Sequence, residues 1–186
     1  MAKERIKKER IKKVIGGVRD FLRKEKKVIE KPEIENILPH RGRMLLLDQV
    51  SISEKAVVGK FTVSEEVCQG HEFNGQLIFR GVDIVEMAAQ ILGVWAYQHS
   101  EFQGKLAFFR SIQGEVKFKD KVEPGDNLII ETAVGEKNPR IEISGRPPDR
   151  LIQRIIGERF TAFVDKKRKA EISGIELIIV ENSQRA

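Results

Sequence analysis

Proton transfer is the chemistry that the side chains of this sequence best support. His71 follows a glycine in a polar stretch, and a neutral imidazole can take up a proton near physiological pH. Glu86 lies in an apolar stretch, where loss of solvent is expected to raise the pKa of its carboxyl group and make it an acid. His99 and Cys68 have no supporting neighbours. The histidines and the cysteine lack the spacing of metal ligands, so we predict neither a metal site nor a cofactor.

One long helical pattern must position Glu86. Residues 81–98 carry apolar side chains on nearly every side, which is typical of a buried helix. Gln90 follows Glu86 by one turn and can orient its carboxyl group. Asp83, one turn earlier, is a second carboxylate that could couple to Glu86 or replace it. Gly81, at the start of the helix, could offer a backbone N–H and the positive end of the helix dipole to a substrate oxygen.

Strand patterns lie on both sides of this helix in the sequence. Residues 33–38 suit a helical turn, and residues 70–79 are loop-like. Strands are predicted at residues 43–52, 55–63, 106–112, 115–122, 127–134, 151–165 and 169–180. A sheet that wraps a single apolar helix belongs to the α+β class.

Length and composition favour one domain with an appendage. The chain has 186 residues, of which 40% are hydrophobic, enough for a sizeable core. A single cysteine excludes an internal disulfide, which indicates a reducing compartment. No apolar run approaches the length of a membrane span or the core of a signal peptide. We therefore predict a cytoplasmic protein.

The positive charge belongs to the N-terminal segment. Residues 1–31 hold 13 lysines and arginines against five acidic residues, whereas the remaining 155 residues carry a net charge of −2. This distribution argues against a fold that binds nucleic acid as a whole. Apolar spacings over residues 3–27 suit an amphipathic helix, either lying on its own domain or contacting a membrane surface or an acidic partner. We predict an extension at residues 1–31 and a main domain at residues 32–186.

Three stretches, taken in order, resemble the β-hydroxyacyl-ACP dehydratase family. Residues 38–41 (LPHR) run into 44–50 (MLLLDQV), like the opening LPHR…LLVDRV of that family. Residues 70–90 (GHEFNGQLIFRGVDIVEMAAQ) are similar to its GHFPGxPxxPGVxxxEAMAQ motif. Residues 109–118, followed by the PGD turn at 124–126, resemble the strands after the family's helix. Together the resemblance covers residues 33–181.

This resemblance implies a hotdog fold, in which a curved antiparallel sheet surrounds the helix at 81–98. Family members form dimers by joining their sheets edge to edge, and larger assemblies such as a trimer of dimers also occur. Each active site then takes its histidine from one subunit and its acid from the other. By this likeness His71 and Glu86 are catalytic, and His40 belongs to a motif with a packing role. The substrate-binding residues implied in the same way are Phe79, Gly81, Val82 and Gln90.

The activity implied is the dehydration of (3R)-hydroxyacyl thioesters to trans-2-enoyl thioesters in fatty-acid synthesis. The substrate would be carried on acyl-carrier protein or on coenzyme A, and the basic N-terminal segment could recruit an acidic carrier. One alternative is a hotdog thioesterase, in which Glu86 or Asp83 activates a water. Another is a non-catalytic protein that binds acyl groups and has a structural or regulatory role.

The loop that carries His71 departs from the family pattern. Asn74, Leu77 and Arg80 stand where the family has prolines, and Glu72 is an extra residue. Because proline fixes φ, its loss is expected to loosen this segment. The extra residue either forms a local bulge that leaves the site intact or turns His71 out of reach.

Overall fold

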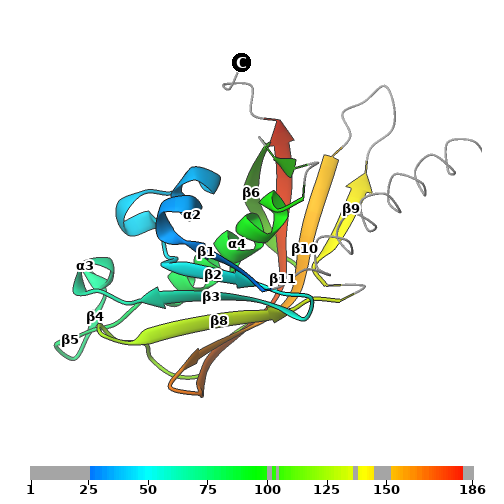
Figure 1. The fold of residues 1–186 in the computed structure, drawn as a ribbon. Helices are drawn as coiled ribbons and strands as arrows, with labels where there is room; N and C mark the ends of the chain where they lie inside the picture. Colours follow the sequence, from blue (N-terminus) through cyan, green and yellow to red (C-terminus); the bar gives the residue numbers. More distant parts are fainter. Residues whose placement is uncertain (1–25, 100–101, 104, 136–137, 145–151, 182–186) are drawn as a thin grey trace, which may run out of the picture.

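A strongly curved antiparallel sheet wraps one long helix, α4 (Gly81–Tyr97), in the computed structural model of the chain (Figure 1). The structure describes residues 26–99, 102–103, 105–135, 138–144 and 152–181. The predicted α+β class is thereby confirmed. None of the helices in this described part is both long and apolar enough to cross a membrane.

The main sheet contains nine strands within the described residues. Seven form the path β1-β2-β3-β8-β10-β11-β6, while β9 pairs with β10 and β7 with β11. Every pairing is antiparallel. The strands are β1 (Lys27–Glu30), β2 (Gln49–Ile52), β3 (Ala56–Thr62), β6 (Lys105–Ile112), β7 (Val116–Phe118), β8 (Asn127–Ala133), β9 (Arg140–Ser144), β10 (Ile152–Val164) and β11 (Lys167–Glu181).

The two longest strands, β10 and β11, lie between the two parts of the sheet. β1, β2, β3, β8 and β9 lie on the side of β10, and β6 and β7 lie on the side of β11. β10 and β11 have 13 and 15 residues and pair along almost their whole length. A two-residue turn connects them, with φ of 48° at Asp165 and 64° at Lys166. Positive φ at both central residues is the geometry of a type I′ turn, whose twist matches that of the flanking strands. β8 and β9 share the free side of β10, and β6 and β7 share the free side of β11.

Helix α4 is buried because its side chains are apolar on nearly every face. It packs against strands from both parts of the sheet, namely β2, β3, β6, β10 and β11. Gly59 in β3 allows this close approach, since a Cβ there would lie 2.4 Å from the Ile91 side chain. The third turn of the helix therefore packs directly against the backbone of β3.

Short elements complete one end of the fold. These are α2 (Lys31–Ile37), the 3₁₀ helix η1 (Gly42–Met44), α3 (Glu65–Cys68) and a separate hairpin of β4 (Glu72–Phe73) and β5 (Gln76–Leu77). α3 and the hairpin lie together beyond the ends of β3 and β8 (Figure 1). Residues 43–48, predicted as part of a strand, instead contain η1 and irregular backbone, and the Pro- and Gly-rich stretch at 135–150 contains β9.

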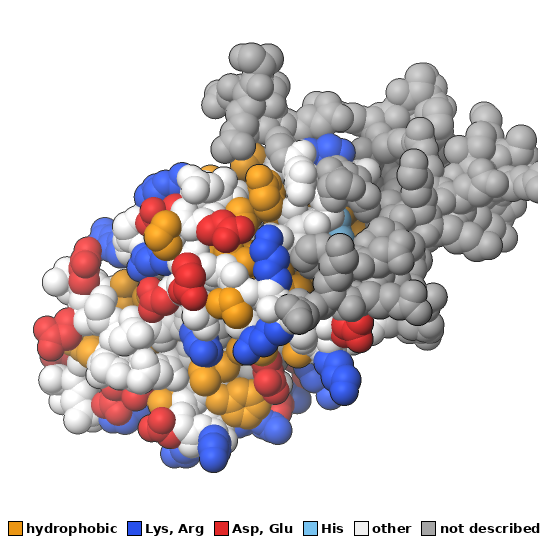
Figure 2. Space-filling view, in the orientation of Figure 1, with side chains coloured by type: hydrophobic (Ala, Val, Ile, Leu, Met, Phe, Trp, Pro, Cys, Tyr) orange, Lys and Arg blue, Asp and Glu red, His pale blue; other side chains and the backbone are white. Residues whose placement is uncertain are grey.

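The sheet begins before the boundary expected at residues 31/32. β1 pairs with β2 from Lys27↔Ile52 to Glu30↔Gln49, so residues 27–30 are part of the sheet. The helix predicted for residues 3–27 lies outside the described residues, apart from its last two positions. Positive and negative side chains are interspersed on the face drawn in Figure 2, in keeping with the small net charge outside the N-terminal segment.

Candidate active site

His71 is an exposed residue held by backbone contacts at both ends of a short loop. Its N–H donates to the carbonyl of Cys68 at 3.0 Å, and its carbonyl accepts from Ile78 N at 3.0 Å. The ring nitrogen Nδ1 lies 2.8 Å from the carbonyl oxygen of Ile78. Because a carbonyl oxygen only accepts, Nδ1 carries the hydrogen, and the neutral ring keeps its lone pair on Nε2. His71 is therefore oriented as a base with Nε2 as the basic atom.

The divergent loop after His71 forms the β4–β5 hairpin. Asn74 and Gly75 have φ of 50° and 74°, a two-residue turn for which Asn-Gly is well suited. The extra residue, Glu72, pairs with Leu77 in the hairpin. The insertion is thus accommodated locally, and hydrogen bonds between the two short strands restrain a segment where the family has prolines.

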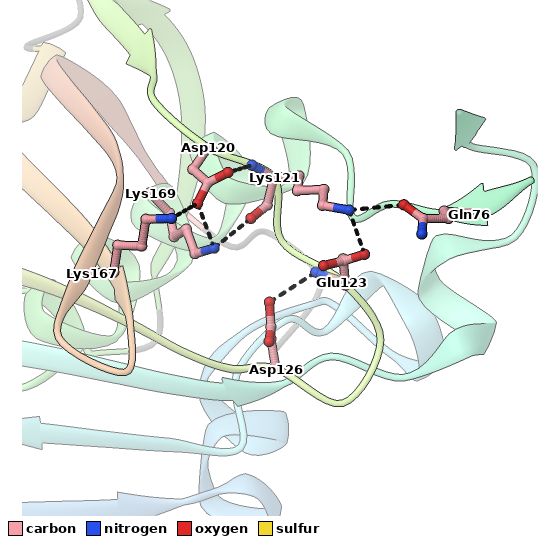
Figure 3. Close-up of polar contacts among 7 residues, drawn as sticks. All are labelled: Gln76, Asp120, Lys121, Glu123, Asp126, Lys167 and Lys169. Carbon is pink, nitrogen blue, oxygen red and sulfur yellow. Dashed lines mark hydrogen bonds and ion pairs between the residues drawn. The ribbon is translucent and has the colours of Figure 1, made fainter. Parts of the chain in front are cut away.

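Side-chain contacts fasten this hairpin to the neighbouring loop (Figure 3). Lys121 donates from Nζ to Gln76 Oε1 at 2.8 Å and to Glu123 Oε1 at 2.8 Å. The adjacent Asp120 pairs with Lys169 Nζ at 3.1 Å, next to the β10–β11 turn. Ion pairs with Lys167 and Lys169 hold the pKa of Asp120 well below its usual range. The β4–β5 hairpin, which follows His71, is therefore connected to β11 through Lys121 and the neighbouring Asp120.

Glu86 lies in the second turn of α4 and is about a quarter exposed. Its Oε1 is 3.0 Å from His40 Nε2 and 3.0 Å from Gln90 Nε2, so two donors converge on one oxygen. The His40 contact has the largest influence and lowers the pKa of Glu86, and the Gln90 amide acts in the same direction against the effect of burial. The expectation of a raised pKa at Glu86 is therefore wrong, because hydrogen bonds outweigh desolvation. Glu86 is a carboxylate at neutral pH.

Gln90 holds both Glu86 and the segment that covers it. Its Nε2 donates to Glu86 and to the carbonyl of Met44 at 2.8 Å, while its Oε1 accepts from Leu46 N at 3.0 Å. The contact with Glu86 is the one that the i,i+4 spacing predicts. Both hydrogens of the amide are used within the chain, so the geometry favours a supporting role for Gln90. Its predicted contact with substrate stays a prediction.

The start of α4 is bordered by apolar side chains. The ring of Phe118 lies over Gly81, where an added Cβ would come within 2.7 Å of it, so only glycine fits without a shift. Phe118 and Val82 are 53% and 66% exposed, and together they present apolar surface beside the helix N-terminus. Phe79 is 2% exposed and packs near the ring of Phe61, so its side chain belongs to the core. Substrate contacts by Gly81, Val82 and Phe79 stay predictions.

Asp83 forms an ion pair with Arg80, the residue that precedes the helix. Arg80 donates from Nε and from a terminal nitrogen to the two carboxyl oxygens of Asp83, both at 2.8 Å. This pair raises the pKa of Arg80. Arg80, which stands where the family has a proline, thus compensates the charge of the buried Asp83 in the first turn of α4. Asp83 is consequently poorly placed to replace Glu86.

The two predicted catalytic residues have different hydrogen-bond partners within the chain, and one of these partners is a histidine that the sequence interpretation set aside. His71 bonds Ile78, and Glu86 bonds His40 and Gln90. His40 was assigned to packing, yet its ring contacts the candidate acid directly. The available signal was the order of the motifs, since LPHR and the helix motif occur together in the family pattern.

His99 and Cys68 lie in the core. His99 is 4% exposed, packs edge-on to Trp95, and burial lowers its pKa to about 4. Cys68 is fully buried, and burial raises the pKa of its thiol. Neither side chain reaches the surface near His71. In the described part of the chain, no cluster of three or more His, Cys, Asp or Glu side chains could hold a metal ion.

Known proteins match this chain in both sequence and fold. The 3-hydroxyacyl-[acyl-carrier-protein] dehydratase FabZ of Enterococcus faecalis is 47% identical over 103 residues, which are 53% of this chain and 72% of the relative. The protein of the same name from Bacillus pumilus is 40% identical over 111 residues, covering 58% of this chain and 76% of the relative.

Two solved structures share the fold. The dehydratase domain from the CurJ module of curacin polyketide synthase has a TM-score of 0.55 at 15% identity, covering 83% of this chain and 50% of that chain. The dehydratase heterocomplex ApeI:P from Xenorhabdus doucetiae has a TM-score of 0.50 at 20% identity, covering 81% of this chain and 91% of that chain. The hotdog fold is confirmed. The FabA-like domain family matches residues 38–145, and the chain therefore belongs to this family, as a relative of the 3-hydroxyacyl-[acyl-carrier-protein] dehydratases.

Proposed function

We propose that this protein removes water from (3R)-hydroxyacyl thioesters carried on acyl-carrier protein and forms trans-2-enoyl thioesters in fatty-acid synthesis. Its similarity to the dehydratases supports the reaction class. The observation that carries the mechanism is the hydrogen bond from His71 Nδ1 to Ile78, since it leaves Nε2 as a base. A thioesterase that uses Asp83 to activate a water is less well supported, because Asp83 is already paired with Arg80.

His71 both accepts and returns the proton in this mechanism. Nε2 takes the proton from C2 of the substrate, and the electrons of the C2–H bond form the C2–C3 double bond as the C3–O bond breaks. The departing hydroxide needs a proton, and the newly formed imidazolium is the group that can supply it. The proton lost from C2 thus leaves as part of water, and the histidine is neutral again.

Glu86 acts as a hydrogen-bond acceptor and not as the resting acid. Its pKa is lowered, so it carries no proton at neutral pH. Both bonds from His40 and Gln90 end on Oε1, and Oε2 is the atom that would accept a hydrogen bond from the 3-hydroxyl group. This contact would hold the C3–O bond in line for elimination.

The N-terminus of α4 supplies the third requirement, a polarised thioester carbonyl. The first N–H groups of a helix have no partner within it, and the helix dipole adds positive potential there. Gly81 begins the helix and has no side chain to obstruct an oxygen. Its N–H would stabilise the charge that develops on the carbonyl when C2 loses its proton.

A second subunit would complete the site. β6 is at one end of the strand order, and among the described residues no strand pairs with its outer edge, where Phe108 and Phe109 are each 45% exposed and Ile112 37% exposed. Pairing of two β6 edges would bury these residues and extend the sheet. His71 of the partner subunit would then face Glu86 of this chain. The basic segment at residues 1–31 could attract an acidic carrier.

The decisive test is turnover of 3-hydroxyacyl-acyl-carrier protein by the full chain, with enoyl absorbance and free thiol followed together. We expect enoyl product without thiol release, whereas thiol release alone would identify a thioesterase. His71→Asn keeps a donor for the Ile78 carbonyl but deletes Nε2, and Glu86→Gln removes the charge. His71→Asn should lower kcat by about 100-fold or more, the size of a general-base contribution. Glu86→Gln should lower kcat by about 100-fold, the cost of a misplaced 3-hydroxyl group. Glu65→Gln, an exposed helical glutamate in α3, is the matched control.

Mixing the two inactive variants tests the shared site. In a dimer whose sites combine His71 of one chain with Glu86 of the other, half of the randomly mixed dimers gain one intact site. Activity should recover to about a quarter of that of the unmodified protein. No recovery after confirmed subunit exchange would place both residues of a site in one chain.

A further inference from the structure

The two histidines near the site are held in different ways. His71 has Nδ1 bonded to a backbone carbonyl, which defines its orientation independently of any substrate. His40 has Nε2 3.0 Å from Glu86 Oε1, while its buried Nδ1 has no hydrogen-bond partner among the described residues. Buried polar atoms are normally bonded, and a histidine kept only for packing gains nothing from an unpaired nitrogen. The ring is therefore arranged around the carboxyl group of Glu86, its polar contact among the described residues.

The geometry at Glu86 assigns different tasks to its two oxygens. His40 and Gln90 approach Oε1 from separate elements, the segment between α2 and η1 and the next turn of α4. A carboxylate oxygen that accepts two N–H donors is restrained in both position and rotation. The second oxygen is thereby directed away from these two donors.

We propose that His40 is a positioning residue for the dehydration reaction: it holds one oxygen of Glu86 and so aims the second oxygen at the substrate's 3-hydroxyl group. The inference rests on the function proposed above. His40 does not touch the substrate, and it acts through Glu86. Its N–H makes Glu86 an acceptor and so leaves the return of the proton to His71.

The charged groups that neighbour His40 and Glu86 in the sequence already have other partners. Asp83 lies one turn before Glu86 on α4 and is paired with Arg80. Arg41, next to His40 on the same segment, donates to the carbonyls of Leu38 and His40 at 2.7 and 2.6 Å. Gln90 is neutral. Removing the His40 N–H would leave burial as the main influence on the pKa of Glu86, with the Gln90 bond opposing it.

The test compares His40→Leu with His40→Gln in the full-length protein. Leucine removes the donor, whereas glutamine can place an N–H near the position of Nε2 but cannot titrate. Carbon-13 NMR of labelled glutamate carboxyl groups, assigned with Glu86→Gln, follows the ionisation of Glu86 without substrate. We expect Glu86 to lose its proton at higher pH in His40→Leu and at the original pH in His40→Gln.

Kinetics provide the second measurement. His40→Leu should lower kcat by about 10- to 100-fold, as expected for a misplaced group. His40→Gln should stay within about threefold of the unmodified protein. In the Glu86→Gln background, His40→Leu should cause no further loss, because its effect passes through Glu86.

The outcomes separate this inference from the function on which it rests. If the unmodified protein forms no enoyl product, the proposed function fails, and the NMR titration still decides whether His40 keeps Glu86 ionised. If His40→Leu leaves the Glu86 titration unchanged, or if its kinetic effect adds fully to that of Glu86→Gln, His40 is not a positioning residue. Circular dichroism and thermal melting of both variants exclude unfolding as the cause of a loss.

Discussion

Replacing Gln90 by methionine would separate the hydrogen bonds of this side chain from its volume. Methionine has nearly the same length and a similar helix propensity, so the change removes polar contacts while filling the same space. The buried N–H of Leu46 and the partly buried carbonyl of Met44 would both lose their partner. Each unsatisfied buried group costs about 1–3 kcal/mol, and partial access of water to Met44 reduces the second cost.

The expected loss of unfolding free energy is therefore about 2–4 kcal/mol, equivalent to a fall in Tm of about 4–16 °C for a chain of this size. Urea unfolding followed by circular dichroism measures it. Gln98→Met, at the C-cap of the same helix, is the matched control, since the bonds of Gln98 to Lys27 and Val94 are partly exposed, and its cost should stay below about 1 kcal/mol. Equal stabilities for both variants would refute the idea that Gln90 supports the segment over Glu86. Enoyl formation by Gln90→Met should also fall, by about tenfold or more.

Further predictions concern the loop and the core. Arg80 has a φ of −67°, which suits proline, but Arg80→Pro should cost about 1–3 kcal/mol because Asp83 loses its partner, and adding Asp83→Asn should recover most of this loss in urea titrations. Lys121→Met should speed amide hydrogen exchange at Gln76 and lower kcat severalfold with little change in the global Tm, as expected if the contact restrains the hairpin alone. Burial lowers the pKa of His99 from 6.5 to about 4, so the unfolded chain binds the proton more readily and stability should decline as pH falls from 6.5 toward 4. His99→Phe should remove about 3 kcal/mol of that decline, and a parallel pH dependence in both proteins would contradict the assignment.

Local signals in the sequence predicted the elements that depend on local properties. The helix at 81–98 could be predicted because apolar residues occupy more than one of its faces. β10 and β11 could be predicted because their strand patterns are long. The β4–β5 hairpin was missed although Asn74-Gly75 is a strong turn signal, since each flanking strand has only two residues. β1 was hidden at the end of a charged stretch, where its pairing with β2 outweighs composition.

The chemistry at Glu86 shows why the site could be predicted only in part. Burial alone is expected to raise the pKa of a carboxyl group. This expectation was reasonable for a buried helix whose contacts with other segments were unknown. The opposite result comes from His40, 46 positions earlier, through the packing of an irregular segment on α4. A contact between distant segments without regular structure leaves no periodic signal. The order of the motifs placed His40 in the family pattern, but only the folded structure shows that its ring contacts Glu86.

The long β10–β11 hairpin also has a consequence for how the chain folds. Its strands are joined by a two-residue turn, so their contacts close with little loss of chain entropy, whereas β3 must wait for β8 across more than 60 residues. The hairpin then offers one free edge to β6 and β7 and the other to β8 and β9. We expect φ-values in the upper range for substitutions near the Asp165-Lys166 turn and low values in β1 and β2, which join the sheet last. The strands next to the β4–β5 hairpin, β3 and β8, would thus be assembled on a template made by residues 152–181.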